Sequence, residues 1–305
     1  MTARLIAALL WLASRLPLEV SRALGRGLGR LAWIVGGSAR RVTERNIFLA
    51  YPDMSAAEQQ RLARRSLEAT GELAAEMGFV WNRPWHEVQA SIVEVCGEEA
   101  VLQAIAEGRG AVMLGPHLGN WEVAGLYIAN WGDALALYEP PHMQALDQMV
   151  RSARERSGTK LVPTDARGLA TLVRTLKRGG VTGILPDQVP PVEEAGENSV
   201  FMGIPCFTMS FASKLLQRTG AAAFFGFAER VPGGFRIHFL PATAELYSDD
   251  LDTSLRALND GVERCLRLAP EQYQWEYKRF RVRPRREPDY YARDWVPEHP
   301  TQGKH

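Results

Sequence analysis

The sequence has few cysteines and no long apolar segment. Cys96, Cys206 and Cys265 are the three cysteines in 305 residues, and no two form a C-x-x-C pair. An odd number at wide spacing indicates neither a zinc site nor a disulfide framework, so a reducing compartment is the simplest inference. The longest apolar run near the N-terminus covers residues 5–13, well short of the roughly 18 residues that a membrane-spanning helix needs.

The chain also has almost no excess of either charge sign, but its charges are unevenly distributed. The formal net charge is +1, yet residues 1–45 contain eight arginines and only Glu19 and Glu44 as acids. A second basic run covers residues 277–286. That run is short, and the chain has no recognised nucleic-acid-binding module, so we expect no nucleic-acid partner.

The N-terminal segment is basic and amphipathic. Arginines alternate with Leu and Trp, and no small-residue cleavage site follows the apolar run, because Arg15, Leu16 and Pro17 stand there. This pattern favours a helix that lies in a membrane interface, with its guanidinium groups toward anionic lipid. A tilted, spanning helix and an ordinary packed helix are the alternatives.

The rest of the chain predicts an α/β domain. Apolar strand candidates alternate with helix candidates, which is typical of crossover units and a mainly parallel central sheet flanked by helices. We expect strands at 91–95, 111–114, 134–137, 160–162 and 181–185, and helices at 55–80, 97–107, 120–130, 141–158, 166–178, 210–219 and 253–268. Segments 221–229 and 235–240 should pair through the turn at 232–234. The expected organisation is a membrane-associating segment at 1–45, a catalytic domain at 46–290 and a tail at 291–305.

The segment after the 111–114 strand contains groups for acid–base chemistry. In an open α/β sheet, ligands bind beyond the carboxyl ends of the strands, where His117 lies. Asn120 is well placed to cap the following helix, which puts Glu122 in its first turn. A carboxylate there can turn back to the imidazole and fix its tautomer, so that His117 could deprotonate a substrate hydroxyl. The alternative is an ordinary turn histidine beside an ordinary first-turn acid.

Three further segments are candidates for the same site. The sequence LPDQ follows the 181–185 strand, and its Asp187 could orient a substrate, hold an arginine or only start a turn. Residues 199–230 begin with an apolar loop that could wall an acyl-chain slot or belong to an ordinary core. Residues 150–159 contain Arg151, Arg154 and Arg156, which could bind an anionic group or remain solvated.

Taken together, these segments resemble the bacterial lipid A late acyltransferases, the lauroyl and myristoyl transferases of endotoxin assembly within the lysophospholipid acyltransferase-like group. The resemblance covers nearly the whole chain. It rests on the basic N-terminus and the arginine-bearing helix, and on GPHLGNWE (115–122), LPDQ (185–188), VFMGIPCFT (200–208), TGAAAFFGFAER (219–230) and PEQYQWEYKRFRVRP (270–284). The chain departs from the family in having Tyr277 where a histidine is common, and Pro116 in the first motif.

The resemblance implies a single glycerol-3-phosphate acyltransferase-like domain. By that resemblance His117 is the general base and Glu122 its partner, while Asn120, Arg154, Asp187 and Gln188 support the site or bind substrate. A fatty acyl chain would pass from acyl carrier protein, where it is held as a phosphopantetheine thioester, to a hydroxyl of a lipid A precursor at the cytoplasmic face of the inner membrane. No metal and no cofactor of the enzyme's own is expected.

Other functions are compatible with the same residues. The acceptor could be a lysophospholipid, an ornithine lipid or a glycolipid, or the protein could bind membrane lipid without turnover. A covalent route through Cys206 is a weaker alternative, because no histidine lies near it in sequence and buried cysteines are commonly inert.

Overall fold

The computed structural model describes residues 2–140, 144–283 and 288–295. The helices, in chain order, are α1 (Thr2–Ala13), α2 (Leu18–Val35), α3 (Ser38–Ala50), α4 (Ala56–Asn82), α5 (Trp85–Gln89), α6 (Glu98–Ala106), α7 (Trp121–Tyr127), α8 (Gln144–Arg156), α9 (Ala166–Lys177), α10 (Phe211–Thr219) and α11 (Leu251–Leu266). Short 3₁₀ helices are η1 (Ile128–Trp131), η2 (Glu193–Ala195), η3 (Ala244–Tyr247) and η4 (Pro270–Gln272). The strands are β1 (Ile92–Cys96), β2 (Ala111–Leu114), β3 (Leu135–Tyr138), β4 (Lys160–Pro163), β5 (Val181–Ile184), β6 (Gly196–Phe201), β7 (Ile204–Met209), β8 (Ala222–Val231) and β9 (Gly234–Pro241).

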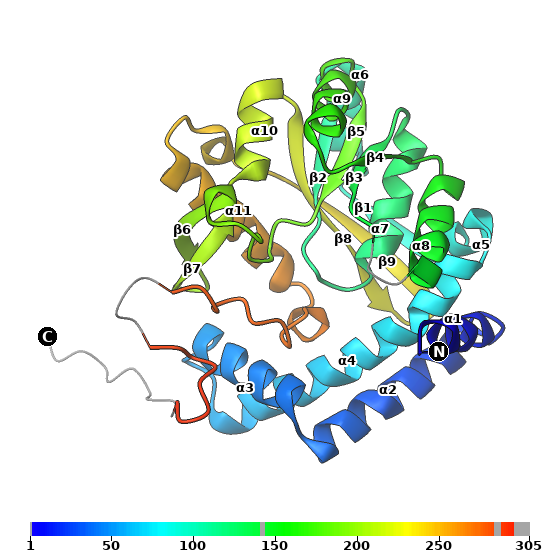
Figure 1. Ribbon diagram of the computed structural model, residues 1–305, viewed down its shortest axis with the longest axis vertical. Coiled ribbons are helices and arrows are strands. Elements are labelled where there is room, and N and C mark those ends of the chain that lie inside the picture. Colours follow the sequence, from blue (N-terminus) through cyan, green and yellow to red (C-terminus); the bar gives the residue numbers. More distant parts are fainter. Residues whose placement is uncertain (1, 141–143, 284–287, 296–305) are drawn as a thin grey trace, which may run out of the picture.

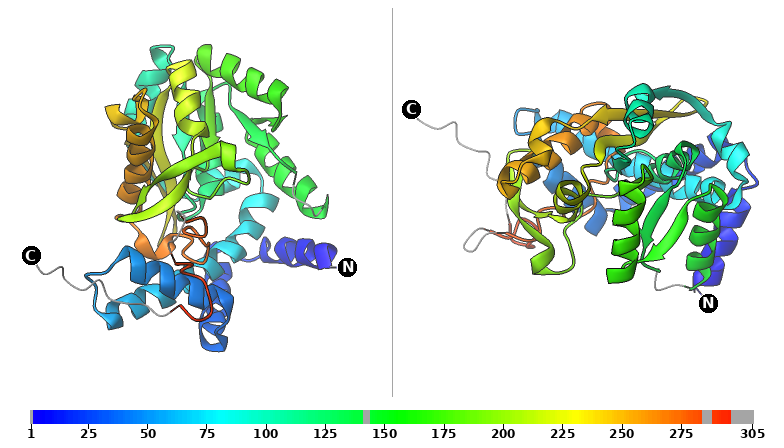
Figure 2. Two further views of the ribbon diagram at one scale, coloured as in Figure 1. Left: turned by 60° about the vertical axis from the view of Figure 1, so that its left-hand side comes forward. Right: turned by 90° about the horizontal axis from the view of Figure 1, so that it is seen from above.

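A five-stranded sheet in the order β1-β9-β8-β2-β5 forms the centre. Its pairings are parallel except for β8 with β9, which form the expected hairpin. β2 is buried along its whole length, as an apolar strand at the middle of a parallel sheet should be. Helices cover both faces of the sheet (Figures 1 and 2). The predicted α/β domain with a mainly parallel central sheet is confirmed.

β3 and β4 form a separate parallel pair beside this sheet. An isolated bridge between Ala134 and Val181 joins the start of β3 to β5. Beyond that bridge the ladder between β3 and β5 does not continue among the described residues. The sheet therefore splits between β3 and β5 toward the carboxyl ends of the strands.

The apolar loop expected at the start of segment 199–230 is an antiparallel hairpin, β6–β7. Its two turn residues, Met202 and Gly203, both have positive φ angles, 52° and 76°. Such angles are what a two-residue hairpin turn requires, because its twist matches that of the strands. The side chain of Glu263 accepts the N–H of Met202, which stabilises this unusual conformation. The expectation of an irregular loop here is wrong.

α4 begins with a capping box, formed by Ser55 and Glu58. α2 packs against α4, and the backbones of the two helices approach each other closely at glycine residues. A Cβ atom on Gly25 would lie 2.3 Å from the backbone oxygen of Gly71, and one on Gly29 would lie 2.2 Å from that of Leu67. Only hydrogen in place of a side chain allows this approach, so the glycines determine how α2 lies on α4 (Figure 1).

The arginines of α2 point to α4. Arg22, Arg26 and Arg30 donate to Glu76, Glu72 and Glu68 of α4, respectively. Each turn forward along α2 is thus matched by one turn backward along α4. This corrects the expectation that these guanidinium groups face lipid. The reason is the antiparallel packing: two helices with charges at i, i+4 and i+8 bring one charge row opposite the other.

The opposite face of α2 remains apolar and exposed. Its exposed residues follow a helical stripe: Val20, Leu24, Leu28, Leu31 and Val35. None of the helices in the described part of the chain is both long and apolar enough to cross a membrane. α3 runs through residue 45 without a break, and the domain boundaries expected from the sequence stay predictions.

Candidate active site

His117 lies directly beyond β2, in a loop next to the one that follows β5. Because β2 and β5 are parallel neighbours, the segments that contain His117 and Asp187 leave the sheet at the same edge. Asp187 binds the histidine twice. Its Oδ1 lies 2.8 Å from Nδ1 of the imidazole, and its Oδ2 accepts the backbone N–H of His117 at 2.9 Å. The carboxylate therefore fixes both the loop and the ring.

Asp187 is buried, with 2% of its surface exposed. Burial alone would raise its pKa, but the charge of His117 and the hydrogen bonds that it donates hold the pKa of Asp187 below its ordinary value. An ionised carboxylate can only accept, so Nδ1 of His117 is the donor in this pair. In the neutral ring the lone pair is then on Nε2, the atom that faces away from Asp187.

The other sides of the imidazole are also held. The amide nitrogen of Gln188 lies 3.1 Å from Nε2 of His117, and it also donates to the side chain of Gln274 at 3.3 Å. The backbone N–H of Gln274 donates to the carbonyl of His117. The ring of Trp121 lies 4.8 Å from the imidazole, centroid to centroid. These contacts hold the imidazole in one orientation, with its Nε2 next to the side-chain amide of Gln188.

Glu122 does not contact His117 among the described interactions; it pairs with Arg154. Nη2 and Nε of Arg154 donate to Oε1 and Oε2 of Glu122 at 2.5 and 3.3 Å. Burial lowers the pKa of Arg154, but the charge of Glu122 and the hydrogen bonds that it accepts together leave this pKa raised. The expected His117–Glu122 contact is therefore corrected to His117–Asp187. The physical reason is that Glu122, in the first turn of α7, faces α8, while Asp187 already occupies Nδ1.

Asn120 caps α7 as predicted. Its Oδ1 accepts the N–H of Val123 at 3.2 Å, and its Nδ2 donates to Glu76 of α4 at 3.0 Å. Glu76 is fully buried and also accepts from Arg22 and Arg230. Burial would raise the pKa of Glu76, but these two arginines hold it lowered. The cap of the helix that contains Trp121 and Glu122 thus depends on a charge on another helix.

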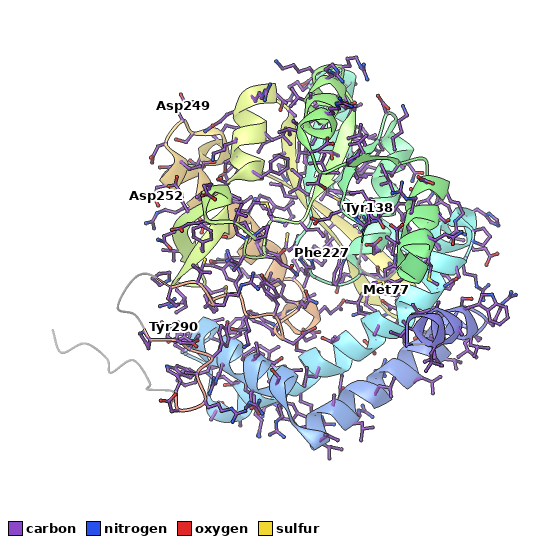
Figure 3. All side chains as sticks on the ribbon, viewed as in Figure 1. Met77, Tyr138, Phe227, Asp249, Asp252 and Tyr290 are labelled. Atoms are coloured by element: carbon purple, nitrogen blue, oxygen red, sulfur yellow. The ribbon has the colours of Figure 1, made fainter. Side chains whose placement is uncertain are left out.

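A cavity of about 420 Å³ opens where the sheet splits. It is lined by Leu137 of β3 and Ile184 of β5, and by apolar side chains from α7, α9 and α10. Trp121, Glu122 and Arg154 form part of its wall. Tyr138, labelled in Figure 3, lies beside this wall, where its ring faces the guanidinium of Arg154 at 5.6 Å. The cavity is thus mostly apolar, with an ion pair in its wall and Trp121 between it and His117.

The remaining candidates lie elsewhere. Cys206 is completely buried in β7, where its Sγ lies 3.5 Å from the hydroxyl of Thr208. No contact between Cys206 and a histidine occurs among the described residues. Arg151 and Arg156 are directed away from Glu122: Arg151 pairs with Glu155, and Arg156 donates to the carbonyl of Trp81. Of the three arginines, Arg154 is the one at the cavity.

Sequence reasoning missed the roles of Trp121, Gln274 and Glu76. The first two are in the quoted segments GPHLGNWE and QYQWEY, so the signal was present, but side-chain contacts were needed to show which letters face the histidine. Glu76 was hidden, because a glutamate in a long amphipathic helix normally faces solvent.

A family model described as bacterial lipid A biosynthesis acyltransferase matches residues 1–282. The chain is 29% identical to the lipid A biosynthesis lauroyltransferase of Escherichia coli strain K12 over 92% of each chain. It is 25% identical to the palmitoleoyltransferase of the same strain, over 90% of this chain and 89% of that one. With the myristoyltransferase the identity is 24%, over 84% and 79%.

Proposed function

The chain belongs to the bacterial lipid A biosynthesis acyltransferases and is an acyltransferase; from this premise we propose that it transfers a fatty acyl chain from acyl carrier protein to a hydroxyl of a lipid A precursor. The observation that carries the proposal is the His117–Asp187 pair, whose imidazole lies against Trp121, a residue of the wall of the apolar cavity. A base held in one tautomer has a use in transfer to an alcohol, and none in simple lipid binding.

His117 acts as the general base. Asp187 keeps the proton on Nδ1, so Nε2 can accept the proton of the acceptor hydroxyl. In the free enzyme the amide of Gln188 donates to Nε2, and it marks the position that the hydroxyl takes. The negative charge of Asp187 then stabilises the imidazolium that forms.

The hydroxyl oxygen attacks the thioester carbon directly. A C–O bond forms as the C–S bond breaks, and the proton held by His117 passes to the departing thiolate. No acyl group is attached to the enzyme, and Cys206, buried in β7, takes no part. The acyl donor brings its own phosphopantetheine arm, so the proposal includes no cofactor bound by the enzyme.

The cavity holds the acyl chain, and Arg154 lies near the thioester end of that chain. Glu122 engages Nε and Nη2 of Arg154, and Nη1 has no partner among the described residues. Donors near the site must stabilise the oxyanion that develops on the thioester oxygen. The backbone N–H groups of Leu118, Gly119 and Asn120 already donate to other carbonyls, which supports Arg154 for this role.

The protein acts at a membrane surface, at the cytoplasmic face of the inner membrane. The exposed apolar stripe of α2 supports attachment to a membrane surface, together with exposed Leu5, Leu9 and Leu12 on α1. Such helices bind the interface by burying an apolar face between lipid headgroups. Replacing Leu24 and Leu28 by Ser should release the protein from anionic vesicles in flotation, while turnover of a detergent-dispersed acceptor continues.

The reaction is tested with purified enzyme, an acyl thioester of acyl carrier protein and a lipid A precursor. His117→Ala should abolish transfer, whereas Cys206→Ala should leave it largely intact; the opposite result would reverse the assignment. Asp187→Asn should lower kcat by about a hundredfold or more, because the tautomer is no longer fixed.

Mass spectrometry identifies the acceptor. Lipid A from cells that lack the gene should have lost one secondary acyl chain. If lipid A is unchanged and the enzyme acts on another membrane lipid, that lipid is the acceptor and the proposed chemistry stays the same.

A further inference from the structure

The outer faces of α9 and α10 present cations without acids. Arg167, Arg174 and Lys177 of α9 and Lys214 and Arg218 of α10 are all exposed. Neither Ala166–Lys177 nor Phe211–Thr219 contains an Asp or Glu. The two helices pack side by side at the end of the sheet farthest from α2 (Figures 1 and 2). We name these five side chains the α9–α10 basic face.

The charges of this face are not neutralised by neighbours. None of the five forms an ion pair within the described part of the chain; Arg174 donates only to the hydroxyl of Thr171. The acids Asp249 and Asp252 lie on the side of α10 away from α9 (Figure 3). The whole chain has 36 basic and 35 acidic residues, so a two-helix surface without acids departs clearly from the average.

The same two helices line the cavity with their inner sides. Leu172 of α9 and Phe211 of α10 are in the cavity wall. Thr164, just before α9, lines it as well. A protein bound on the outer face of these helices would therefore stand next to the space that we assign to the acyl chain.

Resting on the proposed function, we infer that the α9–α10 basic face is the docking surface for the acidic carrier protein that delivers the thioester. Complementary charge raises the association rate and fixes orientation more than it raises affinity. A carrier protein, unlike a bilayer, needs no apolar anchor, and α9 and α10 contribute none of the large apolar side chains that are exposed among the described residues. Helix α2 lies at the opposite end of the molecule from α9 and α10 (Figure 1), and its apolar stripe is exposed, so carrier and membrane would approach from different sides.

The test reverses two charges that do not line the cavity. For the double variant Arg174→Glu with Arg218→Glu, kcat/KM is measured with lauroyl acyl carrier protein and with lauroyl pantetheine, with the acceptor in detergent micelles. The value for lauroyl acyl carrier protein, divided by the value for lauroyl pantetheine, should fall at least about tenfold. The fall should come mainly through KM for the carrier-bound donor, because like charges now oppose each other. Added salt should slow the wild type more than the variant.

The matched control is Arg41→Glu with Arg61→Glu, which makes the same change in net charge at exposed positions of α3 and α4 and should leave the ratio unchanged. An unchanged ratio in the α9–α10 variant, or an equal fall in the control, overturns the docking surface while the reaction stands. A wild type that uses lauroyl pantetheine but neither uses nor binds the carrier protein overturns the proposed donor, and the docking surface with it.

Discussion

The arginines of α2 and the cations of α9 and α10 carry the same charge in opposite surroundings. Arg22, on α2, has 2% of its side chain exposed and meets Glu76, which has none exposed. Arg26 and Arg30 also meet glutamates of α4, although about half of each arginine side chain is exposed. On α9 and α10, by contrast, the cations face solvent without acidic partners in the described structure.

This difference separates structural charge from charge that is available to a partner. The basic N-terminal segment accounts for most of the sequence's charge asymmetry, yet three of its arginines are used to hold α2 on α4. The smaller cluster on α9 and α10 is spread over two helices and is left outward. A count of charges along the chain therefore does not show which cations are available to a partner.

The largest expected effect comes from removing the buried end of the α2–α4 pairing. Glu76→Gln leaves Arg22 and Arg230 buried with no full counter-charge from that position, and the free energy of unfolding should fall by about 3–5 kcal/mol. Glu68→Gln, at the exposed end, should cost no more than about 1 kcal/mol. Urea unfolding followed by circular dichroism measures both. Equal losses at the two positions would contradict the distinction between a buried and an exposed pair.

Acid should remove the same stabilisation gradually. The pKa of Glu76 is lowered in the folded protein, so its contribution is complete above the ordinary glutamate pKa and is lost as the pH falls through the lower folded value. The difference in unfolding free energy between wild type and Glu76→Gln should therefore stay constant from pH 7 down to the ordinary glutamate pKa of 4.5 and shrink as the pH falls further. A difference that grows on acidification would show that Glu76 is not held as the ionised form.

The close contact between α2 and α4 at Gly25 gives the next largest effect on stability. Gly25→Ala places a Cβ 2.3 Å from the backbone oxygen of Gly71, so α2 must move away from α4 and its arginines from their partners. We expect a loss of about 1–3 kcal/mol. Gly27→Ala is the control, because no atom lies within 4 Å of its Cβ, and alanine should stabilise the helix by up to about 1 kcal/mol. Thermal unfolding distinguishes the two; destabilisation by both would point to a general intolerance of α2.

Most of the fold could be predicted from local patterns in the sequence. β2 is a short apolar run between Gly110 and Gly115, β5 is a short run that follows Gly180, and both strands were predicted within two residues. The β6–β7 hairpin was missed because its turn uses Met202 in a left-handed conformation, which a non-glycine residue seldom adopts. The crossing of α2 and α4 was missed because a glycine pattern does not name its partner.

The candidate site was predicted in its residues but not in its pairing. His117, Asp187, Gln188, Glu122 and Arg154 all lie at the expected sheet edge. The sequence placed Glu122 near His117 because they are five residues apart, whereas the parallel neighbours β2 and β5 bring Asp187, seventy residues away, to within 2.8 Å. Which acid faces which base depends on the direction of the first turn of α7, and spacing alone does not fix that direction.

The smallest expected effect is the stability change of the α9–α10 variant. Arg174 and Arg218 are exposed and form no ion pair in the described structure, so Arg174→Glu with Arg218→Glu should change the free energy of unfolding by no more than about 0.5 kcal/mol per site. The same urea titration that registers Glu76→Gln measures it. A near-zero change, beside a loss of carrier-dependent turnover, would show that these charges serve a partner and not the fold. A large loss of stability would place them with the arginines of α2, because only cations that the folded chain itself uses are costly to reverse.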